Sequence, residues 1–153
     1  MKKFNFSHLL AIALVALSLS TFGCQQPTSV TTVYATPIGT WLSTYNETFA
    51  ITSSSLTNSY NGSEVYAGNK LCIAPISDTA GTIFIKYTSN AYNSSVVGKW
   101  YAVSYKNLTS SSISLSGAYN SSGVSGTDSL EEAISTFTIE NGYFGTYSEC
   151  VKQ

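Results

Sequence analysis

The sequence predicts an all-β, mainly antiparallel domain, arranged as an up-and-down β-barrel of about eight strands with one short helix near the C-terminus. From Ile38 onward, short stretches of alternating apolar and polar residues are separated by clusters of Gly, Asn and Ser. That pattern is typical of antiparallel strands joined by tight turns. Segment 127–137 alone has helical spacing. A chain of 153 residues suits one core, and closing the sheet removes its exposed edges. A two-sheet sandwich is the alternative.

Alternation along the chain places each strand in turn. The clearest case is 112–119, where Ile113, Leu115 and Tyr119 share one face and serines occupy the other. Such a strand is expected to be half buried. The other predicted strands are 38–45, 47–52, 56–60, 64–67, 71–76, 82–88, 99–106 and 143–149. Turns are expected at 61–62, 68–69 and 79–81.

The predicted helix interrupts this series late in the chain. Asp128 is expected to cap the backbone amides three residues on, and Glu131 to return the contact as in a capping box. Three apolar residues then recur at helical spacing: Leu130, Ile134 and Phe137. We therefore expect two to three helical turns lying against the sheet and ending near Asn141-Gly142.

The first 23 residues have the features of a signal peptide. Lys2 and Lys3 precede an apolar run, 9–19, that is too short to span a bilayer. The run is followed by Gly23-Cys24, which resembles the lipobox of bacterial lipoproteins. The resemblance implies that residues 1–23 are removed and that Cys24 is lipidated. The alternative is ordinary secretion after a small residue such as Ser20, which leaves Cys24 as a thiol.

The resemblance also implies a place in the cell and a division of the chain. A lipidated Cys24 anchors the protein to a membrane of the bacterial cell envelope, with the outer membrane or cell surface expected. Residues 24–36 are polar, contain a Pro and carry no pattern that buries them. They are interpreted as a lipidated flexible tether. The folded domain is expected over 37–150.

Composition excludes several classes of chemistry. All seven basic residues are lysines, and the only histidine is His8, inside the predicted signal peptide. The mature chain therefore lacks the imidazole that most nucleophilic pairs and zinc sites need. No catalytic residue, metal or cofactor is predicted, and an enzyme is not expected. From residue 24 on, five lysines face eight acidic residues, so a nucleic-acid partner is not expected.

Two cysteines, Cys72 and Cys150, lie in the predicted domain. Disulfides persist outside the cytoplasm, so these cysteines are expected to pair with each other. The alternative is a thiolate metal site or a redox pair. Neither cysteine has a Cys or His close to it in sequence, which disfavours that alternative.

The first strand carries Ile38-Gly39-Thr40-Trp41. This Gly-x-Trp resembles the motif that opens the lipocalin and wider calycin barrels, in which the Trp closes one end of the barrel beneath the cavity. The resemblance covers about residues 37–149 and implies a lipocalin-like up-and-down β-barrel. In the family a late basic residue stacks on this Trp. The chain has no Arg, and Lys152 is not assigned to that position because it lies close to the end.

Tyrosine is unusually frequent, with 11 in the chain. An aromatic ring with a polar tip suits a pocket for an amphipathic ligand. The residues predicted to contact a ligand are Tyr66, Tyr87, Trp100, Tyr101, Tyr105 and Tyr119. The alternative is that each of these tyrosines simply occupies a half-buried strand position.

The expected function follows from the lipocalin resemblance. Together with the lipobox at Cys24, it predicts a membrane-anchored, non-catalytic monomer that binds a small apolar or amphipathic ligand inside the barrel. A different function is also open, in which the barrel is filled and the surface binds a protein. Ser116-Gly117-Ala118-Tyr119 is similar to a loop of membrane-bound lysozyme inhibitors, which gives one version of that alternative.

Overall fold

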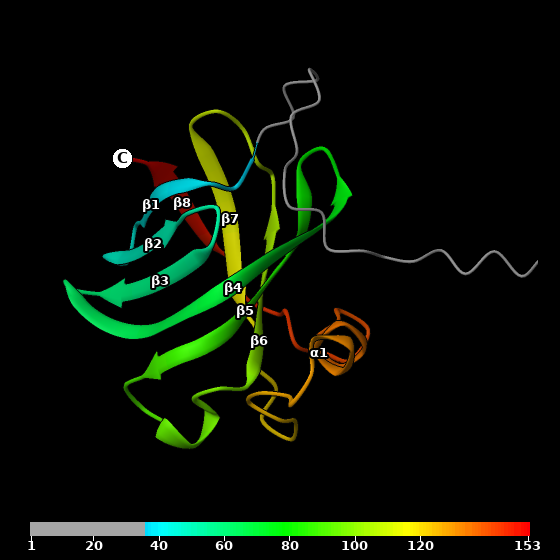
Figure 1. Cartoon of the computed structure of the whole chain (residues 1–153). Coiled ribbons are helices and arrows are strands. Elements are labelled where there is room, and N and C mark those ends of the chain that lie inside the picture. The colour runs from blue at the N-terminus through cyan, green and yellow to red at the C-terminus, as the bar shows by residue number, and fades with distance from the viewer. Residues whose placement is uncertain (1–35) are drawn as a thin grey trace, which may run out of the picture.

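The computed structural model describes residues 36–153, in which eight antiparallel strands close into a barrel with neighbours in chain order (Figure 1). The strands are β1 Gly39–Ser43, β2 Glu47–Ile51, β3 Ser55–Tyr60, β4 Ser63–Ser77, β5 Ala80–Asn90, β6 Trp100–Lys106, β7 Ser112–Gly117 and β8 Ser148–Lys152. A 3-10 turn, η1 Ser94–Val96, and one helix, α1 Leu130–Thr136, complete the described part. The predicted up-and-down barrel is confirmed, and the sandwich is not formed.

Closure depends on the first and last strands. β8 pairs with β7 on one side and with β1 on the other, where Trp41 faces Lys152 and Ser43 faces Cys150. Every strand therefore has two paired neighbours, although β4 is paired with β3 only over 63–69.

The up-and-down order gives the barrel two different ends. We call the end where β1 begins the N-terminal end; it also carries the turns β2–β3, β4–β5 and β6–β7. The opposite end, the distal end, carries the turns β1–β2, β3–β4 and β5–β6 and the long connection 118–147. The helix α1 belongs to that connection and lies outside the barrel, beside β5 and β6 (Figure 1).

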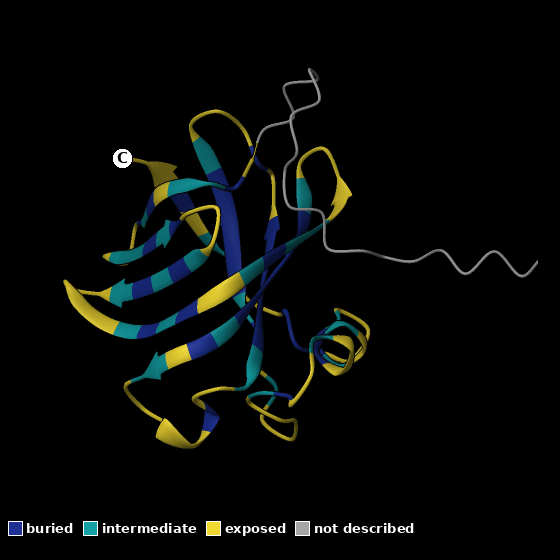
Figure 2. Cartoon of the chain, in the orientation of Figure 1, coloured by how far each residue is buried: buried dark blue, intermediate teal, exposed yellow. Residues whose placement is uncertain are grey.

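The core follows from the two-residue period of the strands. Residues paired across neighbouring strands share a face, and the inward face carries the apolar positions of each strand. The least exposed include Trp41, Leu56, Ile83, Ile85 and Val103, all at 0 %. Figure 2 shows the resulting alternation of buried and more exposed positions along the ribbons.

One predicted turn is wrong. The expected strands 64–67 and 71–76 form the single strand β4, and the chain passes 68–69 through register shifts rather than a reversal. Lys70 has a positive φ of 52° there, as in a β-bulge. Gly68 is needed because a Cβ at this position would lie 2.8 Å from the Lys86 carbonyl oxygen on β5.

The predicted helix is confirmed, but its cap lies one residue later than expected and it ends at Thr136, well before the expected Asn141-Gly142. The Ser129 Oγ accepts the Glu132 amide at 3.1 Å, and the Glu132 carboxylate accepts the Asp128 amide at 3.1 Å. This is a capping-box arrangement shifted along the chain from Asp128 and Glu131. The predicted last strand at 143–149 is also displaced, because β8 starts at Ser148.

Candidate functional site

Three of the predicted ligand residues meet inside the distal half of the barrel. Tyr87 and Tyr101 are stacked with ring centroids 4.8 Å apart, and Tyr66 meets both rings edge-on at 5.9 and 5.3 Å. All three side chains are buried, with at most 8 % exposed. The rings therefore pack on one another and fill the space that a lumenal ligand would need.

Burial controls the ionisation of this tyrosine cluster, which is Tyr66, Tyr87 and Tyr101. Loss of hydration raises the pKa of each hydroxyl well above its ordinary value, because burial disfavours the charged form. For Tyr66 the neighbouring tyrosines and Glu47 raise the pKa further. The three hydroxyls remain protonated near neutral pH and act as hydrogen-bonding groups.

A carboxylate that the sequence analysis did not select lies beside this cluster. Glu47 begins β2, and its two carboxylate oxygens accept hydrogen bonds from Asn58 Nδ2 at 3.0 Å and from Ser148 Oγ at 3.1 Å. Asn58 is 1 % exposed. The sequence did contain a signal, since Glu47 shares the two-residue period of Phe49 and Ile51 and must point the same way.

The other predicted ligand residues do not join the cluster. Tyr105 also points inward, but four residues further along β6 toward the N-terminal end, where its hydroxyl lies against Gly81. Trp100 lies on the outer face, and its backbone exchanges hydrogen bonds with that of Thr127. Tyr119 is 76 % exposed in the connection that follows β7. A single lumenal site built from all six residues is therefore not formed.

The Gly-x-Trp motif closes the barrel toward its N-terminal end. Trp41 is fully buried, and its Nε1 donates to the Pro37 carbonyl at 2.8 Å. The Lys152 ammonium lies 5.4 Å from the centroid of the Trp41 ring, within the range of a cation–π contact. Gly39 makes room for this lysine, because a Cβ there would lie 3.0 Å from Lys152 Cε. Lys152 near the end of β8 thus lies over the ring of the buried Trp41 on β1.

The predicted disulfide between Cys72 and Cys150 is wrong. Cys150 is a free, buried thiol whose Sγ donates to the Ser148 carbonyl at 3.4 Å. It points into the barrel with Ser43 and Ile113. Cys72 shares the outer face of β4 and β5 with Phe84, so the sheet itself separates the two cysteines. Burial, followed by the charges of Glu47 and Glu149, raises the pKa of Cys150 to about 12.

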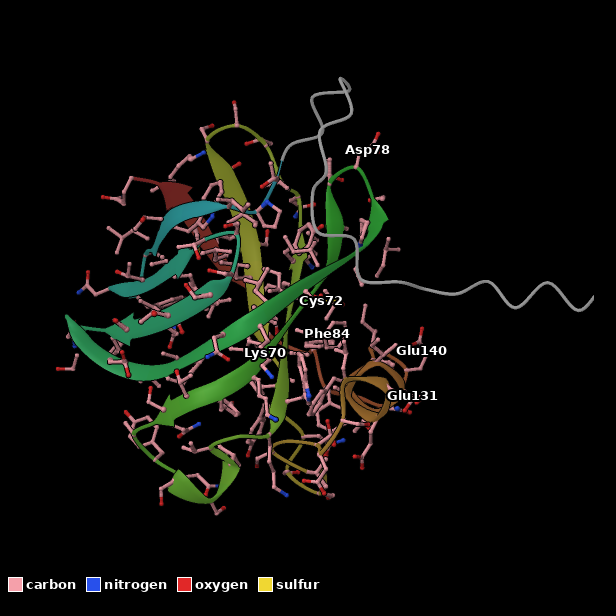
Figure 3. The ribbon with its side chains drawn as sticks, viewed as in Figure 1. Lys70, Cys72, Asp78, Phe84, Glu131 and Glu140 are labelled. Atoms are coloured by element: carbon pink, nitrogen blue, oxygen red, sulfur yellow. The ribbon has the colours of Figure 1, made fainter. Side chains whose placement is uncertain are left out.

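A pocket lies outside the barrel, between α1 with the segment after it and the outer face of β4 to β6. Its volume is about 230 Å³. Figure 3 labels Phe84 on the sheet side and Glu140 on the helix side. The apolar lining residues are Ala74, Pro75, Ile76, Phe84, Ile134, Phe137, Ile139 and Phe144; the polar ones are Thr82, Ser104, Thr138 and Glu140.

The pocket has a buried aromatic floor and an apolar rim. Phe84 and Phe137 are buried at 3 % and 2 % exposure, and the Phe137 ring packs edge-on against Tyr101 and Tyr143. Ile76 and Ile139 remain 75 % and 61 % exposed. Small-molecule sites are mostly apolar concavities with a few placed polar groups, and this pocket has that composition. The pocket could not be predicted from the sequence, because it joins residues of β4 to a connection more than 50 positions later.

Residues 36–153 contain one α-helix, Leu130–Thr136. No helix in this range has the length and apolar character needed to cross a bilayer. No group of three or more His, Cys, Asp or Glu side chains in the same range is arranged to hold a metal ion. Residues 1–35, including Cys24 and most of the tether, lie outside the described part.

The fold and the two sites define a closed eight-stranded antiparallel barrel with a packed lumen and an external apolar pocket. Comparison of the chain with protein-family models, with curated proteins and with solved structures finds no match.

Proposed function

We propose that this protein is a non-catalytic, lipocalin-like lipoprotein that holds a small apolar or amphipathic molecule in the pocket beside α1. The observation that carries the proposal is the pocket itself, about 230 Å³ in volume and lined mainly by Ile, Phe, Pro and Ala. The strand order and the Gly39–Trp41–Lys152 arrangement support the lipocalin-like architecture. The packed tyrosine cluster argues against a ligand in the lumen, where such a barrel would first be expected to bind one.

The chemistry of the lining restricts the ligand. Ile134, Phe84 and Phe137 suit an apolar body, while the hydroxyls of Thr82 and Ser104 offer hydrogen bonds. The only charged lining residue is Glu140, which disfavours an anionic head group. The volume lies just below the roughly 300–1,000 Å³ of pockets for drug-sized molecules. A small neutral or cationic amphiphile therefore fits best.

Native mass spectrometry of the protein extracted from its own host's membrane tests both halves of the proposal. A lipidated Cys24 adds a covalent mass, and a bound amphiphile adds a dissociable one. Ala74→Trp places an indole in the pocket and is expected to remove the dissociable mass while leaving the covalent lipid. Ala50→Trp, on the outer face of β2 and absent from the pocket lining, is the matched control.

The outcomes separate the anchor from the ligand. Loss of the adduct in both tryptophan variants, or an unmutated protein with no adduct, contradicts the ligand-binding half. A Cys24 thiol that carries no lipid, or that is held in a disulfide, contradicts the anchored half alone.

The packed lumen also supports a second candidate function, the binding of a protein such as lysozyme. Tyr119, at the end of Ser116-Gly117-Ala118-Tyr119, is 76 % exposed and free to enter a partner's cleft. If this function is correct, the purified protein inhibits lysozyme and Tyr119→Ala abolishes the inhibition with an unchanged urea midpoint. Tyr92→Ala, in another loop and 82 % exposed, is expected to retain it. An unmutated protein without inhibition removes this candidate.

A further inference from the structure

The distal end of the barrel presents a repeated Tyr-Asn pair. Four of its loops each expose one tyrosine that is followed directly by an asparagine. The tyrosines are Tyr45, Tyr60, Tyr92 and Tyr119, exposed by 71 %, 51 %, 82 % and 76 %. The loops are the turns β1–β2, β3–β4 and β5–β6 and the start of the connection after β7. In residues 36–153 these are the tyrosines that are at least half exposed.

The fold explains the asparagines but not the tyrosines. Asn46 and Asn61 take positive φ values of 61° and 50°, a conformation that Asn tolerates well in turns. Asn93 accepts the Ser95 amide at 3.1 Å, and Asn120 accepts the Ser122 amide at 3.0 Å. Each asparagine therefore forms its turn. The tyrosine rings before them lie mostly in solvent and add little to the core.

The loops surround one end of the molecule instead of forming one apolar patch. Successive distal turns lie two strands apart in the barrel order, so the four loops that carry the tyrosines are distributed around the barrel mouth. Figure 2 shows exposed residues at the β3–β4 turn and in the β5–β6 loop. Beside the tyrosines, these loops consist largely of Asn, Ser and Gly. Protein interfaces instead concentrate their strongest contacts near a desolvated centre.

Several charged side chains at the distal end make contacts within the protein. Lys99 and Asp128 form an ion pair at 3.4 Å, and the Glu64 carboxylate accepts a hydrogen bond from Ser89. Both oxygens of Glu47 are bound by Asn58 and Ser148. The Tyr-Asn loops themselves offer mainly aromatic rings, amides and hydroxyls, which suits a ligand that is itself uncharged and rich in hydroxyl groups.

We propose that the four Tyr-Asn loops form a binding surface for a neutral polysaccharide. Each ring offers a flat apolar face to the C–H face of one sugar, and the neighbouring Asn and Ser groups hydrogen-bond its hydroxyls. Four similar weak contacts suit a ligand that repeats the same unit, because linked contacts gain affinity from effective concentration. This inference goes beyond the proposed amphiphile site and does not depend on it.

Native affinity electrophoresis tests the surface with defined probes: hydroxyethylcellulose, laminarin, galactomannan and glycol chitin in the gel. At least one of these is expected to retard the unmutated protein. Each single Tyr→Ala change at the four positions is expected to weaken retardation about two- to tenfold, and the quadruple change more than 100-fold. Tyr→Phe changes keep the ring and are expected to retain most of the binding. Raised salt is expected to leave it unchanged.

Val151→Ala is the matched control, because Val151 is 57 % exposed on β8 near the other end. Far-ultraviolet circular dichroism of each variant confirms that the exposed changes leave the fold intact. The proposal is overturned if no probe retards the protein, if the quadruple variant is retarded equally, or if salt abolishes the effect. A protein partner would overturn it as well, shown by photo-crosslinks from position 60 or 92 to a protein with no polysaccharide retardation.

Discussion

Above about pH 10 the barrel is expected to unfold with a steep dependence on pH. Four buried acids, Cys150 and the tyrosine cluster Tyr66, Tyr87 and Tyr101, all have pKa values raised by burial. In the unfolded chain the thiol loses its proton near pH 8.5–9 and the tyrosines near pH 10. The folded protein keeps these protons, so the unfolded state binds fewer of them and the free energy of unfolding falls as pH rises.

The size of the effect follows from the number of groups. Stability is unaffected by these groups below about pH 8.5, and Cys150 alone then lowers it by about 1.4 kcal/mol for each pH unit. Above pH 10 the tyrosines contribute too, and the loss approaches roughly 5 kcal/mol for each unit. Small domains have a total stability of about 5–15 kcal/mol, so unfolding is expected between about pH 10 and 12.

Urea titrations followed by circular dichroism at pH 8, 9, 10 and 10.5 measure this slope. Tyr101→Phe removes one titrating group and is expected to make the slope shallower above pH 10, even if it lowers stability at pH 8. Tyr92→Phe, in an exposed loop, is the control and should leave the slope unchanged. Equal slopes for the wild type and Tyr101→Phe would contradict the link between burial and alkaline unfolding.

Trp41→Ala is expected to destabilise the barrel by about 3–5 kcal/mol, the usual cost of removing a large buried aromatic side chain. Trp41 is 0 % exposed, so its removal creates a buried cavity. The substitution also leaves the Pro37 carbonyl without its hydrogen-bond donor and removes the aromatic ring beneath Lys152. Urea unfolding followed by far-ultraviolet circular dichroism measures the loss, since tryptophan fluorescence changes with the mutation itself.

Two variants separate the causes of that loss. Lys152→Met keeps an apolar stem over the ring but removes the charge, and is expected to cost about 0.5–1 kcal/mol if the cation–π contact contributes. Trp100→Ala removes the same side chain from a half-buried outer position and is expected to cost less than half as much as Trp41→Ala. A Trp41→Ala protein as stable as the wild type would show that Gly-x-Trp does not close this barrel.

The period of the strands was predictable because it is a local property. Alternation placed Ile113 with Leu115 and Ile83 with Ile85, and both pairs do line the interior. The same alternation places Glu47 on the inward face with Phe49. A carboxylate is nevertheless not expected inside a barrel until its hydrogen-bond partners are known. Its donor Ser148 is 101 residues away, and no local pattern links two such positions.

The errors share the same physical origin. A bulge and a turn both use Gly and a positive φ, so 68–69 looked like a reversal until β5 was known to continue the pairing on both sides of it. The prediction of a Cys72–Cys150 disulfide was wrong because pairing depends on which face of the sheet each side chain occupies. The pocket beside α1 was not predicted, because a site between a helix and a sheet depends on how the connection 118–147 packs on the outside of the barrel.

Closure of the barrel by its last strand has a consequence for how the chain acquires its structure. A chain that emerges from a ribosome or a translocon presents β1 early, but β8 is missing until residue 152 has appeared. Until then β1 and β7 both have a bare edge, and the interior can reach only a partly formed state. The pairing of β1 with β8 joins strands more than 100 positions apart in the sequence. Contacts between such distant segments form slowly. The barrel therefore closes only when β8 is available, and this five-residue strand sets the moment of assembly.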